Sequence, residues 1–420
     1  MNYLLAFIII CALITSAVMV MRLLQIIFLF VYRKRAKEEI LVSEEQLPKV
    51  SVLIPAYNEE KVIEKTLRRI TELDYPEEKI EILVINPGSK DRTGEIAREV
   101  AAQVRKKVRV IDASNDFEHH GKPRALNFAL KYVQGEIIVI YDADSLVNKM
   151  AVKYLVSYLV QHPEVAMAFG MRQALNPHTF FARFGYLESL SQQLLTEAAP
   201  PKEGHKFLFS PGTNVAIRKS VLEEIGGWDD NALTEDFEIS VRLHAHGYKI
   251  EYVHAALSKE EVPEKVAIWV AQRTRWARGG NHVFLKYLGQ LREKLREKNF
   301  RFIYLTVLFK LIEFYAPMIA LVVSDVLLIL GLLEIFVFGG MGIGFFLWLI
   351  FYLLLFLQIM ACLSYAREIN LKNVVSALLL YFYFQLWLFV FIRVIWLDIV
   401  RAPNLWEKTE RFASIGKEEE

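Results

Sequence analysis

The chain has 420 residues, of which 54% are hydrophobic and 23% are charged. This composition excludes an ordinary soluble protein, which is less apolar, and a bundle made only of membrane helices, which carries fewer charges. The net charge of +2 gives no reason to expect a nucleic-acid partner, and the only cysteines, Cys11 and Cys362, lie in apolar stretches, so any metal should be held by oxygen ligands.

The N-terminal segment, residues 1–37, is predicted to be a transmembrane helix with a basic flank. Tyr3–Tyr32 contains a single charge, Arg22, and is long enough to cross a bilayer. A cleaved signal peptide is the alternative, but there the basic residues precede a shorter apolar stretch, whereas here Arg33–Lys37 follows a long one. Because basic residues stay in the cytoplasm, we expect the N-terminus outside and the following domain inside.

Residues 48–262 are predicted to form an α/β domain with a mostly parallel sheet and helices on both faces. Short β-branched runs alternate there with amphipathic segments, and the runs are Val50–Ile54, Ile80–Ile85, Val108–Ile111 and Ile137–Tyr141. Ligands of such sheets bind at the carboxyl ends of the strands. Polar segments follow three of these runs, namely Pro55–Glu59, Asn86–Ser89 and Asp142–Asp144.

The rest of the chain reads as membrane-associated. Basic and apolar residues interleave at helical spacing over residues 263–313, which is typical of helices in the membrane interface. Residues 314–400 contain three apolar blocks, read as three spans: Phe314–Phe338, Met341–Ser364 and Asn373–Ile392. Residues 401–420 are expected to form a charged amphipathic tail. Three spans after a cytoplasmic domain would place this tail outside, whereas its basic residues favour the inside.

Asp142 and Asp144 form a candidate site for Mg²⁺ or Mn²⁺. Two carboxylates one residue apart beyond a strand can converge on one hard cation that also binds substrate phosphates. Such an ion would act as a Lewis acid on a departing diphosphate. The alternative is a turn with two solvated carboxylates, which this short motif alone does not exclude.

Several motifs in order and spacing resemble the family-2 inverting glycosyltransferases, which have the GT-A (Rossmann-like) fold. They cover roughly 230 residues, so chance agreement is small. With flanking membrane helices, the last motif resembles the processive branch, which includes cellulose, chitin, hyaluronan and poly-N-acetylglucosamine synthases. The motifs are Val50–Glu60, Gly88–Thr93, Gly121–Asn127, Tyr141–Ser145, Pro211–Asn214, Gly226–Asp229, Thr234–Asp236 and Gln272–Trp276.

This resemblance implies roles for individual residues. Asp236 would be the general base that takes the proton from an acceptor hydroxyl. The metal would be held by Asp142 and Asp144, and the acceptor would contact Glu235, Gln272 and Trp276. The donor would be bound by Pro55, Ala56, Tyr57, Glu59, Asn86, Lys122, Asp142 and Arg275.

Some of these roles have a structural alternative. Asp236 could be a first-turn helix acid behind the N-cap Thr234, and Trp276 could be an interfacial membrane anchor. Lys122 could be a solvated surface lysine, and Glu59 a first-turn acid, a use compatible with ligand contact.

Asn86-Pro87 departs from the family pattern. Relatives usually have two aspartates ahead of Gly-Ser, and the first accepts a hydrogen bond from the nucleotide base. An Asn carbonyl can still accept one bond, but it brings no charge, and Pro87 removes a backbone donor. The nucleotide base is therefore recognised in a different way, or the donor is another nucleotide sugar, or the activity is reduced.

Three further sequence features carry weaker expectations. Trp406–Arg411 resembles a tail of poly-N-acetylglucosamine-type synthases, with a plain surface helix as the alternative. Asp325 and Glu334 lie in apolar blocks and either are structural or line a polar pathway.

Three functions remain open from sequence. The first is a processive synthase in the cell membrane that elongates a glycan from a nucleotide sugar, most simply a UDP-sugar. The second is an enzyme of the same fold that adds one sugar to a membrane lipid. The third is a non-catalytic scaffold, against which the intact Asp142, Asp144 and Asp236 argue. Few spans are available for a pore, so a channel would be narrow or completed by a second copy of the chain or a partner.

Overall fold

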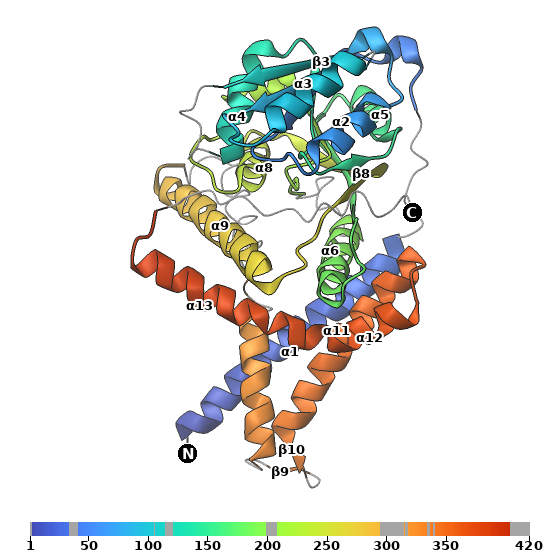
Figure 1. Cartoon of the computed structure of the whole chain (residues 1–420). Helices are drawn as coiled ribbons and strands as arrows, with labels where there is room; N and C mark the ends of the chain where they lie inside the picture. Colours follow the sequence, from blue (N-terminus) through green and yellow to red (C-terminus); the bar gives the residue numbers. More distant parts are fainter. Residues whose placement is uncertain are drawn as a thin grey trace. The chain divides into compact units, whose positions relative to one another are not determined.

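The computed structural model describes residues 2–32, 41–104, 106–113, 121–198, 208–294, 315, 318–333, 337–338 and 341–403. The chain divides into two compact units. We call them the sheet unit, residues 36–179, 201–304 and 401–420, and the apolar unit, residues 1–35, 180–200 and 305–400. Figure 1 shows the elements of each unit.

The sheet unit is built on eight strands in the order β3-β2-β1-β4-β7-β6-β8-β5. β1 pairs in parallel with β2 and β4, and β2 in parallel with β3. β6 and β8 are also parallel, while β7 and β5 pair with their neighbours antiparallel. The strands are β1 Val50–Pro55, β2 Ile80–Asn86, β3 Lys107–Asp112, β4 Ile137–Ile140, β5 Leu146–Val147, β6 Val165–Ala174, β7 Val215–Arg218 and β8 Lys249–Glu260.

Helices cover both faces of this sheet, as the alternating sequence pattern predicted. Successive strand residues point to opposite faces, so Val52 and Leu53 of β1 belong to two different cores. One core contains side chains of α2 (Ile63–Thr71), α3 (Thr93–Gln103) and α5 (Ala151–Gln161). The other contains side chains of α4 (Gly121–Ala129), α7 (Lys219–Glu224) and α8 (Glu235–Ala245). Burial on both faces explains why β1 and β2 read as nearly continuous apolar runs.

Short turns and one long helix complete the sheet unit. Single 3-10 turns occupy Glu44–Gln46, Glu77–Lys79 and Leu130–Tyr132. The long helix α9, Val266–Lys294, carries the Gln272–Trp276 motif and lies in the segment predicted to be interfacial. Of the predicted C-terminal tail, only residues 401–403 are described, and Arg278 of α9 donates to the Ala402 carbonyl oxygen at 2.7 Å. Trp406–Arg411 and the basic cluster Arg33–Lys37 lie outside the described residues.

The apolar unit is built mainly of apolar helices. It contains α1 (Asn2–Tyr32), α6 (Phe180–Ala198), α11 (Ile343–Ala366), α12 (Leu371–Phe384) and α13 (Leu386–Ile399), and a short hairpin of β9 (Val337–Phe338) and β10 (Met341–Gly342). α6 lies within residues 48–262 but packs on α1, α11 and α12. The sequence pattern did not distinguish α6 from the α/β domain.

Within the described residues, two helical stretches are long and apolar enough to cross a membrane: Gly344–Ala366 and Leu371–Ile399. They match the second and third predicted blocks, although the third extends seven residues past Ile392 through α13. The described part of the first block contains a shorter apolar helix, Met318–Leu332, and α1 contains the shorter apolar stretch Ser16–Val31. Glu334 lies outside the described residues.

Candidate active site

The polar turns after β1 and β2 are bonded to each other at the carboxyl edge of the sheet. The backbone N–H of Asn58 donates to Ser89 Oγ at 3.0 Å, and the N–H of Glu59 donates to Thr93 Oγ1 at 2.7 Å. The N–H of Lys90 donates in return to Asn58 Oδ1 at 2.8 Å. Asn58 has a positive φ of 54°, a conformation that asparagine tolerates better than most residues. The turn that starts at Pro55-Ala56-Tyr57 is therefore held rigidly beside the turn of Asn86.

Asn86 uses both ends of its amide inside the protein. Its Oδ1 accepts from the backbone N–H of Ser89 at 3.0 Å, and its Nδ2 donates to Asp112 Oδ1 at 2.8 Å. Asp112 lies opposite Asn86 on the neighbouring strand β3 and also pairs with Arg98. The side chain of Asn86 is buried, whereas that of Asp112 is half exposed.

Lys122 is the cation at the centre of the candidate site. It is the second residue of α4. Its Nζ donates to Asp142 Oδ1 at 2.5 Å and to the Gly212 carbonyl oxygen at 2.8 Å. The same Nζ lies 3.6 Å from Glu235 Oε1. Burial lowers the pKa of Lys122, but the neighbouring carboxylates, Asp142 first, outweigh it and leave the pKa raised. Lys122 is therefore a charged buried lysine and not a solvated one.

The loop Pro211–Asn214 brings the end of β4 and the start of α8 together. Thr213 Oγ1 accepts from the backbone N–H of Asp142 at 3.1 Å. Asn214 is fully buried and donates to the carbonyl oxygens of Met171 and Ala256, so it ties the loop to β6 and β8. Gly212 has a φ of +80°, and a Cβ built on it would lie 3.2 Å from the Asp236 carboxylate. This close approach explains the glycine.

Asp142 and Asp144 offer carboxylates suited to a divalent cation shared with a substrate. Asp142 retains 30% of its side-chain surface exposed, and Asp144 is buried in the same loop. Among the described residues, no group of three or more His, Cys, Asp or Glu side chains is arranged to hold a metal ion. A Mg²⁺ or Mn²⁺ ion bound by one or two carboxylates and completed by phosphate oxygens fits this donor set, whereas a closed all-protein site does not.

The first turn of α8 carries two buried carboxyl groups, Glu235 and Asp236. Burial raises the pKa of Glu235 to about 7, against the opposing charge of Lys122. Burial likewise raises the pKa of Asp236, although its carboxylate accepts from the backbone N–H of Phe237 at 2.8 Å. Both groups line a cavity that is otherwise mostly apolar, which gives the physical cause of the shift. Its other lining residues are Leu126, Ile140, Met167, Ser210, Gly212, Val215, Trp228 and Ile239.

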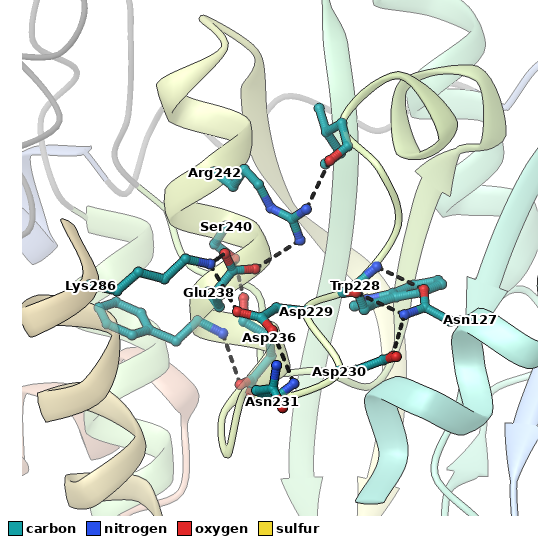
Figure 2. A network of polar contacts seen from close by, with 12 residues as sticks. Asn127, Trp228, Asp229, Asp230, Asn231, Asp236, Glu238, Ser240, Arg242 and Lys286 are labelled. Atoms are coloured by element: carbon teal, nitrogen blue, oxygen red, sulfur yellow. Dashed lines mark hydrogen bonds and ion pairs between the residues drawn. The ribbon is translucent and has the colours of Figure 1, made fainter. Parts of the chain in front are cut away.

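A second polar network, drawn in Figure 2, joins α8 to α9 and to the Gly226–Asp229 motif. The buried carboxylate of Glu238 accepts from Lys286 Nζ at 2.6 Å and from Arg242 at 2.8 Å. Lys286, which lies on α9, also donates to Asp229 at 2.9 Å. We call Glu238, Lys286 and Asp229 the α8–α9 clamp.

The Gly226–Asp229 motif is held from its other side by Asn127 of α4. Asn127 accepts from the backbone N–H of Trp228 and donates to its carbonyl oxygen, both at 2.8 Å. A Cβ on Gly227 would lie only 2.6 Å from Asn127 Oδ1, and Gly227 also has a positive φ of 77°. The motif Gly121–Asn127 thus contributes Lys122 to the carboxylate cluster and Asn127 to this loop.

The Gln272–Trp276 motif lies on α9, which packs against the N-terminus of α8. Arg275 Nη1 donates to the Leu233 carbonyl oxygen at 3.3 Å, and the charge of Arg275 acts on both Glu235 and Asp236. Gln272 accepts from Arg273 at 3.0 Å, and the Arg273 guanidinium lies 4.1 Å from the ring centroid of Trp276. Trp276 is 38% exposed, which leaves its ring available either to a sugar or to a membrane surface.

The structure brings Lys122, Asp142, Glu235, Asp236 and Arg275 together, with Asp144 in the same loop. Pro55, Ala56, Tyr57, Glu59 and Asn86 lie at the neighbouring strand ends of the same edge. Asp112, Asn127, Glu238 and Lys286 were not predicted as site residues. Asn127 belongs to the motif Gly121–Asn127, so the motif could have identified it. The other three carry no local signal, because their partners are distant in sequence or their motif was not recognised.

Comparison with known proteins identifies relatives of this chain. The sequence profile described as glycosyltransferase-like family 2 matches residues 48–279. The probable glycosyltransferase YdaM of Bacillus subtilis is 36% identical over 377 residues, which are 87% of this chain and 88% of the relative. The poly-β-1,6-N-acetyl-D-glucosamine synthase of Staphylococcus epidermidis is 29% identical over 269 residues, which are 62% of each protein.

A solved structure shares the fold. The mannosyltransferase PcManGT of Pyrobaculum calidifontis, determined with GDP-mannose and Mn²⁺, aligns with a TM-score of 0.57 at 20% identity. The alignment covers 92% of this chain and 99% of that one. At this identity the likeness concerns the fold alone, and it confirms the predicted GT-A architecture.

Proposed function

The chain belongs to glycosyltransferase family 2, and from that premise we propose that it is a membrane-bound inverting enzyme that transfers a sugar from a nucleotide-sugar donor to an acceptor hydroxyl. The observation that carries this proposal is the meeting of Lys122, Asp142, Glu235 and Asp236 around Gly212. This cluster would supply a cation for the donor diphosphate and a carboxylate for the acceptor.

The donor diphosphate would be held on the Lys122 side of this cluster. Lys122 is charged and largely buried, and Arg275 adds a guanidinium suited to bidentate contact with phosphate oxygens. Asp142 and Asp144 would hold Mg²⁺ or Mn²⁺, which when bound supplies Lewis-acid stabilisation of the departing diphosphate. Pro55, Ala56, Tyr57 and Glu59 would contact the nucleoside at the neighbouring strand ends.

Asp236 would act as the general base. As the acceptor oxygen attacks the anomeric carbon from the face opposite the diphosphate, its proton passes to the Asp236 carboxylate. The apolar lining that raises the pKa of Asp236 also makes its carboxylate a stronger base than a solvated aspartate. Glu235, Gln272 and Trp276 would contact the acceptor, and the exposed ring of Trp276 suits the apolar face of a pyranose.

We infer that the product is a polysaccharide. The similarity to a poly-β-1,6-N-acetyl-D-glucosamine synthase over 269 residues and the two stretches able to cross a membrane support this inference. The catalytic domain would face the cytoplasm, where nucleotide sugars are made, and the helices would anchor it in the cell membrane. Transfer of one sugar to a membrane lipid is the competing outcome.

The proposal is tested with washed membranes that contain the protein. They are given a panel of radiolabelled nucleotide sugars with Mg²⁺ or Mn²⁺, and the product is separated by solvent extraction and sized. Label in a water-soluble polymer supports polysaccharide synthesis, and label in the organic phase indicates a lipid product. No transfer from any donor, and no difference between the wild type and Asp236→Asn, would remove the proposed function.

A further inference from the structure

The carboxyl edge of the sheet has two chemically different ends. β3, β2, β1 and β4 follow each other in the sheet, with Asp112 closing β3 and Asp142 following β4. Three strand spacings of about 4.8 Å separate these ends by about 14 Å, the scale of an extended nucleoside diphosphate. If the diphosphate lies at the Lys122–Asp142 end, the base lies near Asp112.

The Asp112 end presents a fixed hydrogen-bond acceptor. Asn86 Nδ2 donates to Oδ1 of Asp112 at 2.8 Å, and Arg98 pairs with Oδ2, so two donors set the orientation of this carboxylate. Each carboxylate oxygen has a second lone pair, and the side chain remains half exposed. Asn86, by contrast, is buried and has both ends of its amide engaged. The group available to a ligand at this edge is therefore Asp112 and not Asn86.

We propose that Asp112 determines the base specificity of the donor and selects a nucleobase with a ring N–H, uracil or guanine. This inference rests on the proposed function. A carboxylate only accepts hydrogen bonds, so it pairs with the N3–H of uracil or with the N1–H and amino group of guanine. Cytosine and adenine present an unprotonated ring nitrogen at the same position, and two facing acceptors repel. The negative charge missing at position 86 is thus supplied from the adjacent strand.

The test compares nucleotides that differ mainly in this group. Equilibrium binding of UDP, CDP, GDP and ADP is measured on the purified full-length protein in detergent with Mn²⁺. We expect UDP to bind more tightly than CDP, or GDP more tightly than ADP, by about tenfold or more. Which of the two lactam bases binds better distinguishes a uridine donor from a guanosine donor.

The isosteric variant Asp112→Asn isolates the role of the carboxylate. It should lower the preference for the ring N–H base about tenfold while leaving the affinity for the disfavoured base nearly unchanged. Glu95→Gln, which removes an exposed carboxylate of α3 that pairs with Arg92, is the matched control and should keep the wild-type preference. Asp142→Asn should weaken all four nucleotides together, because it acts on the shared diphosphate.

Three results would overturn the inference. They are a wild type that prefers CDP or ADP, an Asp112→Asn variant with the wild-type ratio, and a variant that weakens all four nucleotides equally. In these cases nucleotides still bind and the proposed function stands. Failure of the wild type to bind any of the four would remove the proposed function along with the inference.

Discussion

Lys122 has more carboxylate neighbours than one cation can balance. Its Nζ is 2.5 Å from Asp142 but 3.6 Å from Glu235, so its electrostatic attraction to Asp142 is the stronger of the two. Glu235 and Asp236 are left in a buried, mostly apolar cavity, and their pKa values rise for that reason. The Glu235–Asp236 pair therefore holds a proton under mildly acidic conditions.

This proton gives the first prediction. We expect kcat/KM to rise with pH and to level off above about 7, because Asp236 can accept a proton only after the Glu235–Asp236 pair has lost its own. In Glu235→Gln this acidic limb should move to lower pH, since a competing carboxylate no longer shares Lys122 and Arg275. Initial rates of transfer across the pH range measure both. A flat profile, or an identical limb in the variant, would contradict the assignment.

The strand-end argument predicted Asp142 at the carboxyl edge of the sheet. Lys122 and Asp236 were predicted from the motifs that resemble family-2 glycosyltransferases, and the structure brings the three residues together. The partner of Asn86 could not be predicted, since Asp112 becomes its neighbour only through the register of β2 and β3. The raised pKa values also depend on packing around α8, which no motif reports.

At the scale of elements, contact between α8 and α9 aligns the proposed general base Asp236 with the Gln272–Trp276 motif. A Cβ on Gly279 of α9 would lie 2.4 Å from Thr234 Cγ2, just before Glu235 and Asp236. Gly280, the next residue, has nothing within 4 Å of such an atom. The two glycines therefore form a matched pair on one helix.

This pair gives the second prediction. Gly279→Ala should lower kcat about 10- to 100-fold, because the added methyl group pushes α9 away from α8 and displaces Arg275 and Asp236. Gly280→Ala should keep full activity and add up to about 1 kcal/mol of stability, since alanine favours the helix. Transfer rates and thermal unfolding measure both variants. Equal activity of the two would show that this close contact does not matter for catalysis.

The α8–α9 clamp gives the third prediction. Lys286→Met removes one charged donor from the buried carboxylate of Glu238 and breaks the link to Asp229. We expect a loss of about 1–2 kcal/mol, moderated because Lys286 is partly exposed, seen as a lower melting temperature of the purified protein. Lys107→Met, at an exposed lysine of β3 with one weak contact to Gln134 at 3.4 Å, is the control. Equal melting temperatures of the two variants would contradict a stabilising role of the α8–α9 clamp.

Element boundaries were predicted well where burial dictates sequence. β1 and β2 extend one residue beyond the predicted runs, and β4 ends one residue before Tyr141. The antiparallel placement of β7 was not predicted. The pairing of β5 with β8 was not predicted either, because β5 has only two residues and leaves no periodic pattern. α6 was likewise not assigned to the apolar unit, since its sequence mixes charged and apolar residues.

At the scale of the whole molecule, the apolar unit contains hydrogen bonds between polar side chains, and such bonds are stronger in a low-dielectric surrounding than in water. Arg22 of α1 donates to Gln358 of α11, which itself donates to Gln25 at 2.9 Å. Asp325 accepts from Tyr381 at 2.6 Å and from Gln385 at 3.1 Å. Large apolar side chains such as Ile392 and Trp396, 65% and 62% exposed, would face water unless lipid covers them.

The fourth prediction concerns membrane attachment. The protein should remain in the membrane pellet after washing at high pH and high salt, because apolar helices are held by lipid and not by surface charge. Immunoblots of pellet and supernatant measure this, with a salt-releasable peripheral protein as control. Release into the wash would show that Gly344–Ala366 and Leu371–Ile399 do not span the bilayer.

The most direct test of the account separates donor binding from transfer in Asp236→Asn. Nucleotide-sugar affinity and the single-turnover rate of transfer are measured on the same preparation, with Glu223→Gln, an exposed carboxylate of α7, as control. Affinity should stay within a fewfold of the wild type, while the rate falls about 10²- to 10⁴-fold, the usual contribution of a general base. A variant that transfers sugar at the wild-type rate would contradict the assignment of Asp236 as the base.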